Sequence, residues 1–380
     1  MDGGNERRFL IVAGEASGDR HAARLVAALK SIGSCRLSGV AGPGLEAAGV
    51  EPLAPMADLA VVGFTGVLAR LPVIFRAYRR LLAAAARSRP HAAVLVDSPG
   101  FNFRLGPALK RRGVPIFYYI APQVWAWHGA RAAQMARWVD RLAVVFPFEE
   151  PLFRAAGVAA RYVGHPLLED LAPEVDAVVL RRELGMAESG AVLLGLLPGS
   201  RPEELRAHAP VLIAAARLLQ SSRPHLTAVL ALAPGLEADA DLGRAAAAAG
   251  IRLARGRTHA VQAFADCCAV ASGTATLETA LFGTPLAVVY RTSRLNWAIA
   301  RRVVKVAHVG LPNIVAGGEV APELLQNALT PERLAGLLGE WLDRPEKLAE
   351  RRRMLARVRE RLGEPGASRR AAEWLWEMTA

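Results

Sequence analysis

The chain has 380 residues and 52% of them are hydrophobic, so it can form the cores of two domains and is not a disordered protein. Its formal net charge is +12, from 47 Lys and Arg against 35 Asp and Glu. This excess favours an anionic partner, namely nucleic acid, a phosphorylated substrate or an acidic membrane face, although an Arg- and Ala-rich composition alone also produces it.

Cysteine spacing and hydropathy indicate the cellular compartment in which the chain works. The three cysteines, Cys35, Cys267 and Cys268, form no motif with zinc spacing, so we expect no metal site and a reducing compartment. No stretch approaches the roughly 18 uninterrupted apolar residues of a membrane span. The apolar stretch before the first glycine loop is too short for a signal peptide. We therefore expect a cytoplasmic protein that at most lies on a membrane surface.

The amino-terminal half opens as a nucleotide-binding fold does. An apolar strand over 9–13 runs into the loop GEASGD at 14–19, and a helix over about 20–30 follows. The loop matches neither the P-loop nor GxGxxG. It places three polar side chains at the carboxyl edge of the predicted sheet, those of Glu15, Ser17 and Asp19. Further strands are predicted over 92–96, 114–120, 141–146 and 160–163, before the domain ends near Gly164–Pro166.

The strand over 92–96 ends in DSPGFN at 97–102. Carboxylates at strand ends of doubly wound sheets face the ligand crevice, so Asp97 is the best candidate for a general base in this half. Two alternatives stay open: Asp97 caps the turn that follows it, or Glu15 or Asp19 shares or replaces its role. After the next strand, APQVWAW at 121–127 carries Trp125 and Trp127, which are too bulky for a loop unless they pack or contact a ligand.

The second half is organised around VLLGLLPGSR at 192–201. Its apolar run predicts a strand buried on both faces over 192–197, and a helix follows from Pro202 to about Gln220. Ser200 stands at the expected N-cap. Backbone N–H groups at the helix start and the Arg201 guanidinium would then surround one point, which predicts an anion site with a diphosphate as its guest. The alternative is an ordinary turn with a solvent-exposed arginine.

A second glycine turn, ASGTATLE at 271–278, repeats this pattern. Ser272 and Thr274 can cap helix N–H groups or meet phosphate oxygens, and Glu278 lies one turn into the helix, where a carboxylate can accept from ribose hydroxyls. Two such turns in one domain are more specific than either alone. The other strands of this half are predicted over 226–232, 251–253, 267–271 and 285–290, and ELLQ at 323–326 is predicted as helix.

Two predicted helical segments, over 66–87 and 294–305, carry arginines on one face and apolar residues on the other. A basic amphipathic helix of this kind can lie on anionic lipid. The alternative is a helix packed on the core with a solvated charged face. From Pro331 onward the chain is predicted to be helical and charged, and we expect its end to pack back across the two domains.

Taken together, several stretches resemble the lipid-A-disaccharide synthase family, and the resemblance covers roughly 9–345. They occur in the family's order: AGEASGD, DSPGFN, APQVWAW, LPGSR, SGTATLE, YR at 290–291, LPN at 311–313 and ELLQ. The resemblance implies an α/β protein with two Rossmann-like domains facing across a cleft, the GT-B fold, with C-terminal helices packing back on the first domain. We expect an acceptor and membrane-facing domain over 1–165, a UDP-sugar-binding domain over 166–345 and a helical tail over 346–380.

The resemblance also implies an inverting, metal-independent glycosyltransferase without a cofactor. Its substrates would be UDP-2,3-diacylglucosamine and 2,3-diacylglucosamine 1-phosphate (lipid X), joined by a β-1,6 bond with release of UDP. Asp97 would be the base, and Arg201 would stabilise the departing diphosphate. The donor would be bound by Gly199, Ser200, Arg201, Ser272, Gly273, Thr274, Glu278, Asn313, Glu323 and Gln326. The acceptor side would include Glu15, Ser17, Asp19, Asn102, Trp125 and Trp127.

Gly66 and His128 depart from the residues the family usually carries at these positions, Glu and Arg, and both lie on the acceptor side. The anionic inner membrane surface would be a partner, and a homodimer is possible. Other enzymes that act on UDP-sugars, such as an epimerase or a peptidoglycan-precursor transferase, are the nearest alternative. A basic nucleic-acid-binding protein is a remote one, because the chain has no Lys/Arg run interleaved with stacking aromatics. We therefore expect no nucleic-acid partner.

Overall fold

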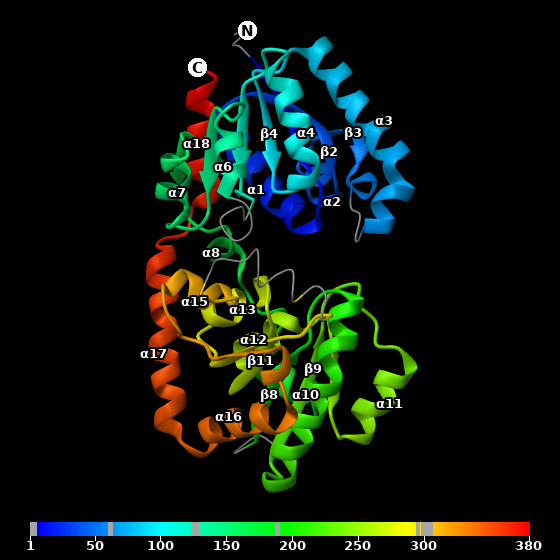
Figure 1. Cartoon of the computed structure of the whole chain (residues 1–380), viewed down its shortest axis with the longest axis vertical. Coiled ribbons are helices and arrows are strands. Elements are labelled where there is room, and N and C mark those ends of the chain that lie inside the picture. The colour runs from blue at the N-terminus through cyan, green and yellow to red at the C-terminus, as the bar shows by residue number, and fades with distance from the viewer. Residues whose placement is uncertain (1–5, 60–63, 123–128, 187–190, 294–296, 298–306) are drawn as a thin grey trace. The chain divides into compact units, whose positions relative to one another are not determined.

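A computed structural model describes residues 6–59, 64–122, 129–186, 191–293, 297 and 307–380 (Figure 1). The chain forms two compact units, each with its own parallel sheet. The first comprises Met1–Glu169 together with Glu364–Ala380, and the second comprises Asp170–Gly363. The expected α/β architecture with two Rossmann-like domains is confirmed.

The first unit is built on a seven-stranded parallel sheet with the order β3-β2-β1-β4-β5-β6-β7. Leu10 and Val12 of β1 face one hydrophobic core and Phe9 and Ile11 face the other, because successive side chains of a strand point to opposite faces. Helices therefore cover both faces, as a parallel sheet requires. The strands are β1 (Arg7–Ala13), β2 (Cys35–Ala41), β3 (Glu51–Pro55), β4 (Ala92–Val96), β5 (Ile116–Tyr119), β6 (Arg141–Val144) and β7 (Ala160–Tyr162).

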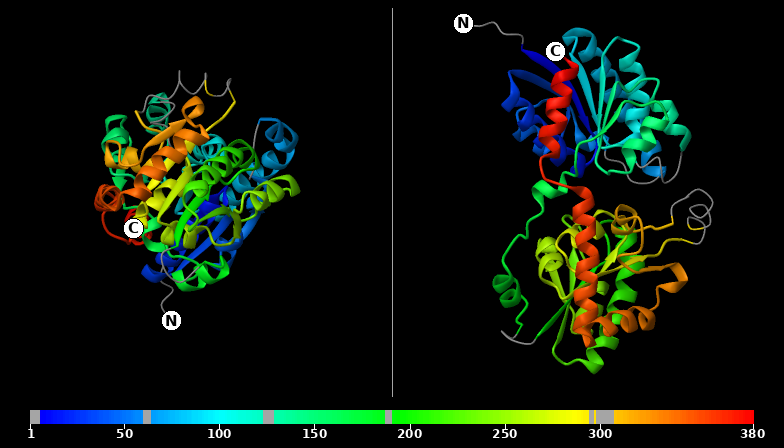
Figure 2. Two further views of the ribbon diagram at one scale, coloured as in Figure 1. Left: turned by 90° about the horizontal axis from the view of Figure 1, so that it is seen from below. Right: turned by 90° about the vertical axis from the view of Figure 1, so that its left-hand side faces the viewer.

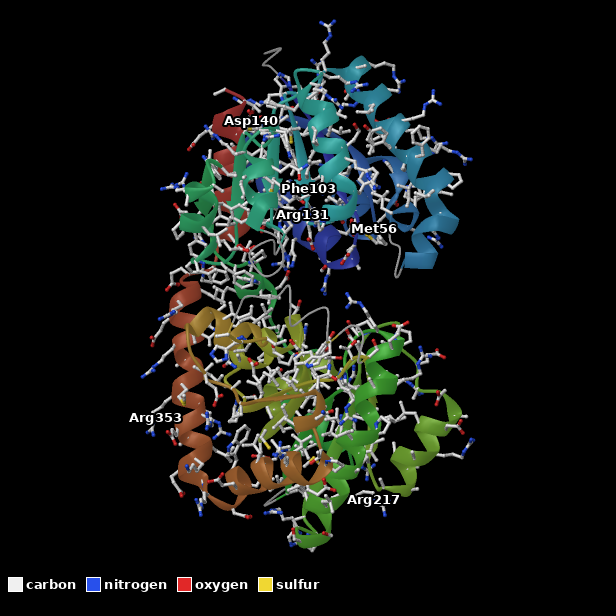
Figure 3. All side chains as sticks on the ribbon, in the orientation of Figure 1. Met56, Phe103, Arg131, Asp140, Arg217 and Arg353 are labelled. Carbon is white, nitrogen blue, oxygen red and sulfur yellow. The ribbon has the colours of Figure 1, made fainter. Side chains whose placement is uncertain are left out.

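The helices of this unit up to α7 connect consecutive strands, and α8 follows β7. Between two neighbouring connections, the Arg131 guanidinium of α6 lies 5.5 Å from the ring centre of Phe103 on α4 (Figure 3). The helices are α1 (Ala16–Ile32), α2 (Pro43–Ala47), η1 (Met56–Asp58), α3 (Phe64–Ser88), α4 (Pro99–Lys110), α6 (Gly129–Met135), α7 (Glu149–Ala155) and α8 (Leu167–Asp170).

The last helix of the chain, α18 (Ala367–Met378), belongs to the first unit and packs along α1 (Figure 2). Its tryptophans are stacked by arginines of the sheet: the Arg7 guanidinium lies 3.9 Å from the Trp376 ring centre, and that of Arg141 lies 5.4 Å from Trp374. The expected packing of the chain's end on the first domain is confirmed for this helix.

The segment expected as one tail over 346–380 divides between the units. Helix α17 (Pro345–Leu362) packs on α13 (Thr274–Leu281) and α15 (Leu311–Ala316) of the second unit, and it buries Leu355, Val358 and Leu362. Residues 363–366, which read GEPG, separate α17 from α18, because glycine and proline interrupt a helix. The first unit likewise runs to Glu169 rather than ending at 165.

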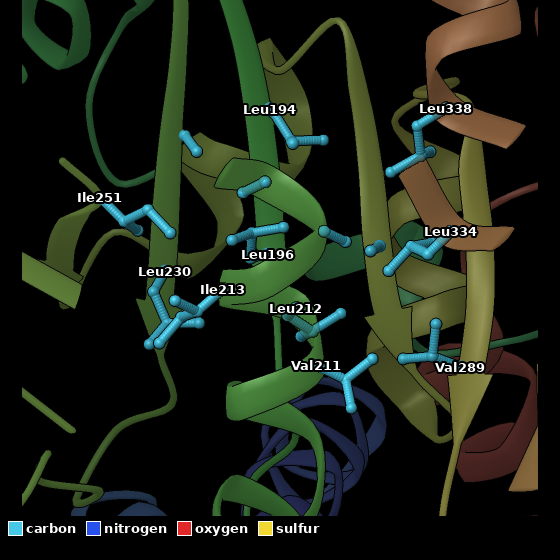
Figure 4. Packing of buried hydrophobic residues seen from close by; sticks show 14 of the residues in the cluster. Leu194, Leu196, Val211, Leu212, Ile213, Leu230, Ile251, Val289, Leu334 and Leu338 are labelled. Atoms are coloured by element: carbon cyan, nitrogen blue, oxygen red, sulfur yellow. The ribbon is translucent and has the colours of Figure 1, made fainter. Parts of the chain in front are cut away.

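The second unit has a six-stranded parallel sheet with the order β10-β9-β8-β11-β12-β13. Leu196 of β8, Leu212 of α10 and Leu334 of α16 meet in its core (Figure 4). The strands are β8 (Val192–Leu197), β9 (Leu226–Leu232), β10 (Arg252–Arg255), β11 (Cys267–Ala271), β12 (Leu286–Tyr290) and β13 (Glu323–Leu325). The remaining helices are α9 (Ala177–Glu183), α10 (Pro202–Ser222), α11 (Ala240–Ala248), α12 (Thr258–Phe264), α13 (Thr274–Leu281), α15 (Leu311–Ala316), η2 (Gln326–Ala328) and α16 (Pro331–Asp343).

The expected helix at ELLQ is wrong. Residues Glu323–Leu325 form the edge strand β13, which pairs with β12 so that Val288 lies opposite Glu323. A four-residue segment has too little pattern to separate strand from helix, and here the open edge of β12 supplies the backbone partners. The strands β2 and β3 were also missed, because their sequences alternate glycine, proline and polar residues with apolar ones.

Helix α3 shows both features that its sequence suggested. Ala77 and Leu81 are buried in the first unit's core. Leu71 and Phe75, two other apolar residues of this helix, are 42% and 59% exposed. No helix among the described residues is long and apolar enough to cross a membrane. The second basic segment, over 294–305, lies outside the described residues except for Trp297.

Candidate functional site

The two glycine turns of the second unit lie side by side. They follow β8 and β11, which are neighbours in the sheet with Leu197 opposite Val270. Because parallel strands end at the same edge, each turn opens at that edge and leads into a helix, α10 or α13. The sequence-based placement of these two turns is reproduced by the structure.

Gly199 makes the first turn possible. Its φ is +121°, and a Cβ atom there would lie 2.6 Å from Cβ of Glu204. The Ser200 N–H donates to Oε2 of Glu204 over 2.9 Å, so the first turn of α10 folds back on its own entry. The expected N-cap at Ser200 is wrong, because Arg201 occupies that position and makes no side-chain cap.

Arg201 presents a cation beside this turn. Its side chain is 61% exposed, and Nη1 lies 3.2 Å from Oε1 of Glu204. The Glu204 carboxylate therefore contacts both groups that were predicted to hold an anion, the Ser200 N–H and the Arg201 guanidinium. An exposed ion pair of this kind is weak, so a phosphate with more charge can compete for the same donors.

The second turn is anchored rather than capped by its polar residues. The Ser272 hydroxyl donates to the Val309 carbonyl over 3.1 Å, and the Ser272 N–H donates to the Val289 carbonyl. Gly273 takes the N-cap position of α13, so Thr274 is the first helical residue. The start of α13 thus carries no side-chain cap of its own.

Glu278 lies on α13 against α12. Its Oε2 accepts from Nε2 of Gln262 over 3.2 Å and lies 3.7 Å from Nε2 of His259. The hydrogen bond to Glu278 raises the pKa of His259, against the effect of its burial. Gln262 is buried, and its Oε1 has no hydrogen-bond partner among the described residues. His259 and Gln262 were not singled out from the sequence, in which an isolated His or Gln carries no motif.

Three residues that were predicted to bind the donor make hydrogen bonds within the chain. The Asn313 amide donates to the Ala321 carbonyl and to Oε1 of Glu323, each over 2.7 Å, and its oxygen accepts from the N–H groups of Val320 and Ala321. Its side chain is fully buried, and all its polar atoms are used. A direct contact of Asn313 with the donor stays a prediction.

Glu323 and Gln326 act in the same way. The Glu323 carboxylate accepts from the N–H groups of Val309 and Gly310, which precede α15. The Gln326 amide lies against the backbone of Thr292: its nitrogen donates to the carbonyl and its oxygen accepts from the N–H, each over 3.1 Å, in the amide orientation that satisfies both. These side chains fix loops at the carboxyl edge of the sheet.

Asp97 stands in an unusual backbone conformation at the end of β4. Asp97 and Ser98 have φ values of +45° and +43°, the left-handed region that costs a residue with a side chain about 1–3 kcal/mol. The Asp97 carbonyl accepts from the Tyr118 hydroxyl and from Nδ2 of Asn102, the latter over 2.7 Å. Asn102, expected on the acceptor side, is buried and stabilises this turn through its hydrogen bond to the Asp97 carbonyl.

The environment of Asp97 suits proton transfer. Burial raises the pKa of its carboxyl from 3.8 to about 6, and the Glu15 carboxylate adds to the rise. Gly14 lets the Ser98 side chain lie close to the loop after β1, since a Cβ at position 14 would lie 2.2 Å from the Ser98 hydroxyl oxygen. Glu15 and Ser17 are exposed at the same edge of the sheet. A carboxyl with a pKa near 6 is ionised at neutral pH and close to the best value for a general base.

Asp19 has a different role from the one considered for it. Its carboxylate is buried and accepts from the N–H groups of Gly42, Gly44 and Leu45, which lead into α2. With its oxygens used in this way Asp19 caps the start of α2, and a part of Asp19 in proton transfer stays a prediction. Trp125, Trp127 and His128 lie outside the described residues. Among the described residues, no group of three or more His, Cys, Asp or Glu side chains is placed to hold a metal ion.

The two parallel sheets define the structural class of the protein. Two parallel α/β units of this kind form a GT-B-like fold. Solved structures share it: UDP-GlcNAc 2-epimerase from Neisseria meningitidis, bound to UDP-GlcNAc, covers 97% of this chain and 98% of its own at a TM-score of 0.60 and 10% identity. MurG from Acinetobacter baumannii covers 98% and 100% at a TM-score of 0.59 and 16% identity. At such identities the likeness shows the fold alone.

The family model described as LpxB, lipid-A-disaccharide synthetase, matches residues 9–376. Lipid-A-disaccharide synthase of Geobacter metallireducens is 42% identical over 375 residues, covering 98% of this chain and 97% of its own. That of Syntrophus aciditrophicus is 44% identical over 371 residues, covering 97% of each. The chain belongs to the lipid-A-disaccharide synthase family, a family of glycosyltransferases of lipid A biosynthesis, which confirms the resemblance drawn from its motifs.

Proposed function

We propose that this chain joins UDP-2,3-diacylglucosamine to lipid X through a β-1,6 bond and releases UDP. The reaction and its substrates follow from the family. The observation that carries the chemistry is the Asp97 turn, which holds an ionised carboxylate with a raised pKa at a strand end. The first unit would activate the acceptor and the second would bind the donor.

In this mechanism Asp97 accepts the proton of the acceptor's 6-hydroxyl as its oxygen attacks the anomeric carbon of the donor. The bond to the UDP oxygen breaks on the opposite side, so the configuration at that carbon inverts. Negative charge grows on the β-phosphate as the bond breaks. Arg201 and the N–H groups of the two glycine turns would stabilise that charge more in the transition state than in the bound substrate.

Donor binding would divide between direct contacts and supporting ones. We assign the diphosphate to Gly199–Arg201 and Ser272–Thr274, and the ribose hydroxyls to Glu278. The Glu278 carboxylate is 14% exposed and already oriented by Gln262. Asn313, Glu323 and Gln326 would serve the site by fixing the loops around it, because their polar atoms are engaged within the chain.

The test is to incubate the purified protein with UDP-2,3-diacylglucosamine and lipid X in detergent, with EDTA present. We expect UDP release that depends on the acceptor, together with a disaccharide product. UDP release or sugar conversion without acceptor would favour a hydrolase or an epimerase. Tight UDP binding without turnover on lipid X would leave the donor site standing and the proposed acceptor wrong.

We also propose that the chain docks on the anionic surface of the inner membrane, on its cytoplasmic side, through the middle of α3. Leu71 and Phe75 are exposed there, and the arginines beside them are exposed as well, namely Arg76, Arg79 and Arg80. The Arg79 guanidinium lies 6.0 Å from the Phe75 ring centre. Apolar side chains next to cations suit the boundary between headgroups and acyl chains.

Charge reversal of Arg76, Arg79 and Arg80 to Glu should reduce sedimentation with vesicles of anionic phospholipid at low salt. The matched control reverses Arg353, Arg357 and Arg359, which are exposed on α17. Equal binding of both variants and the parent chain would rule out this surface. A homodimer stays a prediction that sedimentation equilibrium would test.

A further inference from the structure

His208 is a buried histidine of α10 to which the proposed mechanism gives no role. Its side chain is fully enclosed. Nδ1 lies 2.7 Å from the Pro198 carbonyl oxygen, and Nε2 lies 2.9 Å from the backbone nitrogen of Arg291. One imidazole therefore joins the start of the first glycine turn to the residue that follows β12.

The two partners determine the state of the ring. The Pro198 carbonyl can only accept, so Nδ1 must carry a proton; the Arg291 N–H can only donate, so Nε2 must be unprotonated. Only a neutral imidazole meets both conditions. Burial lowers the pKa of His208, which keeps the ring in that neutral form at pH 7.

The bridge joins parts of the sheet that are not adjacent. The strands β8 and β12 are separated by β11. On the β12 side, the Arg291 guanidinium donates to the carbonyls of Gln326 and Leu329, and the neighbouring Thr292 backbone pairs with the Gln326 amide. On the β8 side, Pro198 is followed directly by Gly199, Ser200 and Arg201. His208 thus connects the Gly199–Arg201 turn to the hydrogen-bonded residues around Arg291, on the other side of β11.

We propose that His208 is a positioning residue of the diphosphate site, which sets the direction of the Gly199–Arg201 turn by tying Pro198 to the end of β12. This inference rests on the proposed function, in which that turn binds the diphosphate of UDP. The N–H groups of a glycine turn converge on one anion only if the turn has a fixed direction. The Glu204 contacts tie this turn to the start of α10, whereas His208 ties it to the end of β12.

The test compares UDP with uridine by titration calorimetry for the parent chain and for His208→Ala. Loss of the tether should weaken UDP binding about tenfold, the effect of about one hydrogen bond. Uridine lacks the diphosphate, so its affinity should stay unchanged. A general loss of structure would instead weaken both ligands. The matched control is His225→Ala, which removes an exposed histidine just beyond the end of α10.

Two further variants separate the two bonds and keep the site filled. In His208→Asn the amide nitrogen can replace Nδ1 toward Pro198, whereas in His208→Gln the amide oxygen can replace Nε2 toward Arg291. Each keeps one bond and loses the tether, so both should bind UDP as weakly as the alanine variant. Thermal unfolding identifies any variant that does not fold, and the other two then carry the test.

The inference is overturned if a folded His208 variant binds UDP as tightly as the parent chain, or if UDP and uridine lose affinity by the same factor. The proposed function fails separately, and takes this inference with it, if the parent chain itself binds UDP no more tightly than uridine.

Discussion

The two units place charge at their sheet edges by different means. In the first, Asp97 and Ser98 adopt the left-handed conformation although both carry side chains, and Tyr118 and Asn102 hold the Asp97 carbonyl in place. In the second, Gly199 takes a positive φ at little cost, and Glu204 folds back over the turn.

This difference matches the chemistry expected of each unit. A proton acceptor needs a partly buried carboxylate in one orientation, which justifies a strained turn supported from inside the sheet. A phosphate site needs N–H groups and a cation that an anion can reach, and in the Gly199 turn both contact the Glu204 carboxylate, for which a phosphate can compete. The comparison predicts that substitutions in the first unit act on turnover, and that those in the second act on turnover and UDP affinity together.

The largest effect should come from Asp97→Asn. Loss of the base should lower kcat by about two to four orders of magnitude, while the affinity for UDP stays close to that of the parent chain. Steady-state kinetics and calorimetry measure the two quantities. A similar loss of UDP affinity would assign Asp97 to the donor site and remove the contrast between the units.

The same substitution should raise the free energy of unfolding at pH 7. The pKa of Asp97 is higher in the folded chain (about 6) than its ordinary value of 3.8, so its ionisation disfavours the fold as pH rises through that interval. Asparagine stays neutral, and its advantage should therefore disappear at pH 3. Urea unfolding at both pH values would show whether the site stores this cost.

Arg201→Ala should lower kcat by about 10²–10³ and weaken UDP binding as well. The guanidinium is 61% exposed, and its partner Glu204 keeps the hydrogen bond from the Ser200 N–H, so the fold should persist. Arg206→Ala is the matched control, because Arg206 lies on the same helix and is 69% exposed. An equal effect of both substitutions would reduce the role of Arg201 to general positive charge.

Tyr118→Phe should lower turnover by less than the substitutions above and should leave UDP binding by the second unit unchanged. It removes one of the two donors to the Asp97 carbonyl and leaves Asn102 in place. We expect kcat to fall about tenfold with UDP affinity unchanged, as for the loss of about one hydrogen bond. If kcat does not change, the left-handed turn is maintained without Tyr118.

The smallest effect concerns pH. The rate kcat/KM should fall below about pH 6 as the Asp97 carboxylate is protonated and should level off above it. Glu15 raises the pKa of Asp97, so Glu15→Gln should move this limb to lower pH. If the fall in kcat/KM occurs at the same pH in Glu15→Gln as in the parent chain, the Glu15 charge does not cause the raised pKa of Asp97. If the parent chain shows no fall in kcat/KM below about pH 6, Asp97 is not the titrating base.

Local sequence was enough to predict both kinds of turn. Uncharged runs such as 192–197 are typical of strands buried on both faces, and the residues after them, PGSR or DSPG, end a strand and start a helix by their own backbone preferences. The positions of Asp97, Arg201 and Glu278 at one edge of each sheet follow from that alternation, because parallel strands all end on the same side.

The tertiary structure decided which polar side chains are available for ligands. Asp19, Asn313 and Glu323 stand in motifs beside the turns, yet their oxygens accept from backbone N–H groups of other segments. His208 reads in sequence as one polar residue on an apolar helix face, and only the fold brings Pro198 and Arg291 to its two nitrogens. Hydrogen bonds between residues far apart in the chain leave no local pattern. The sequence therefore determined where charge can gather, and packing determined which of it stays free to react.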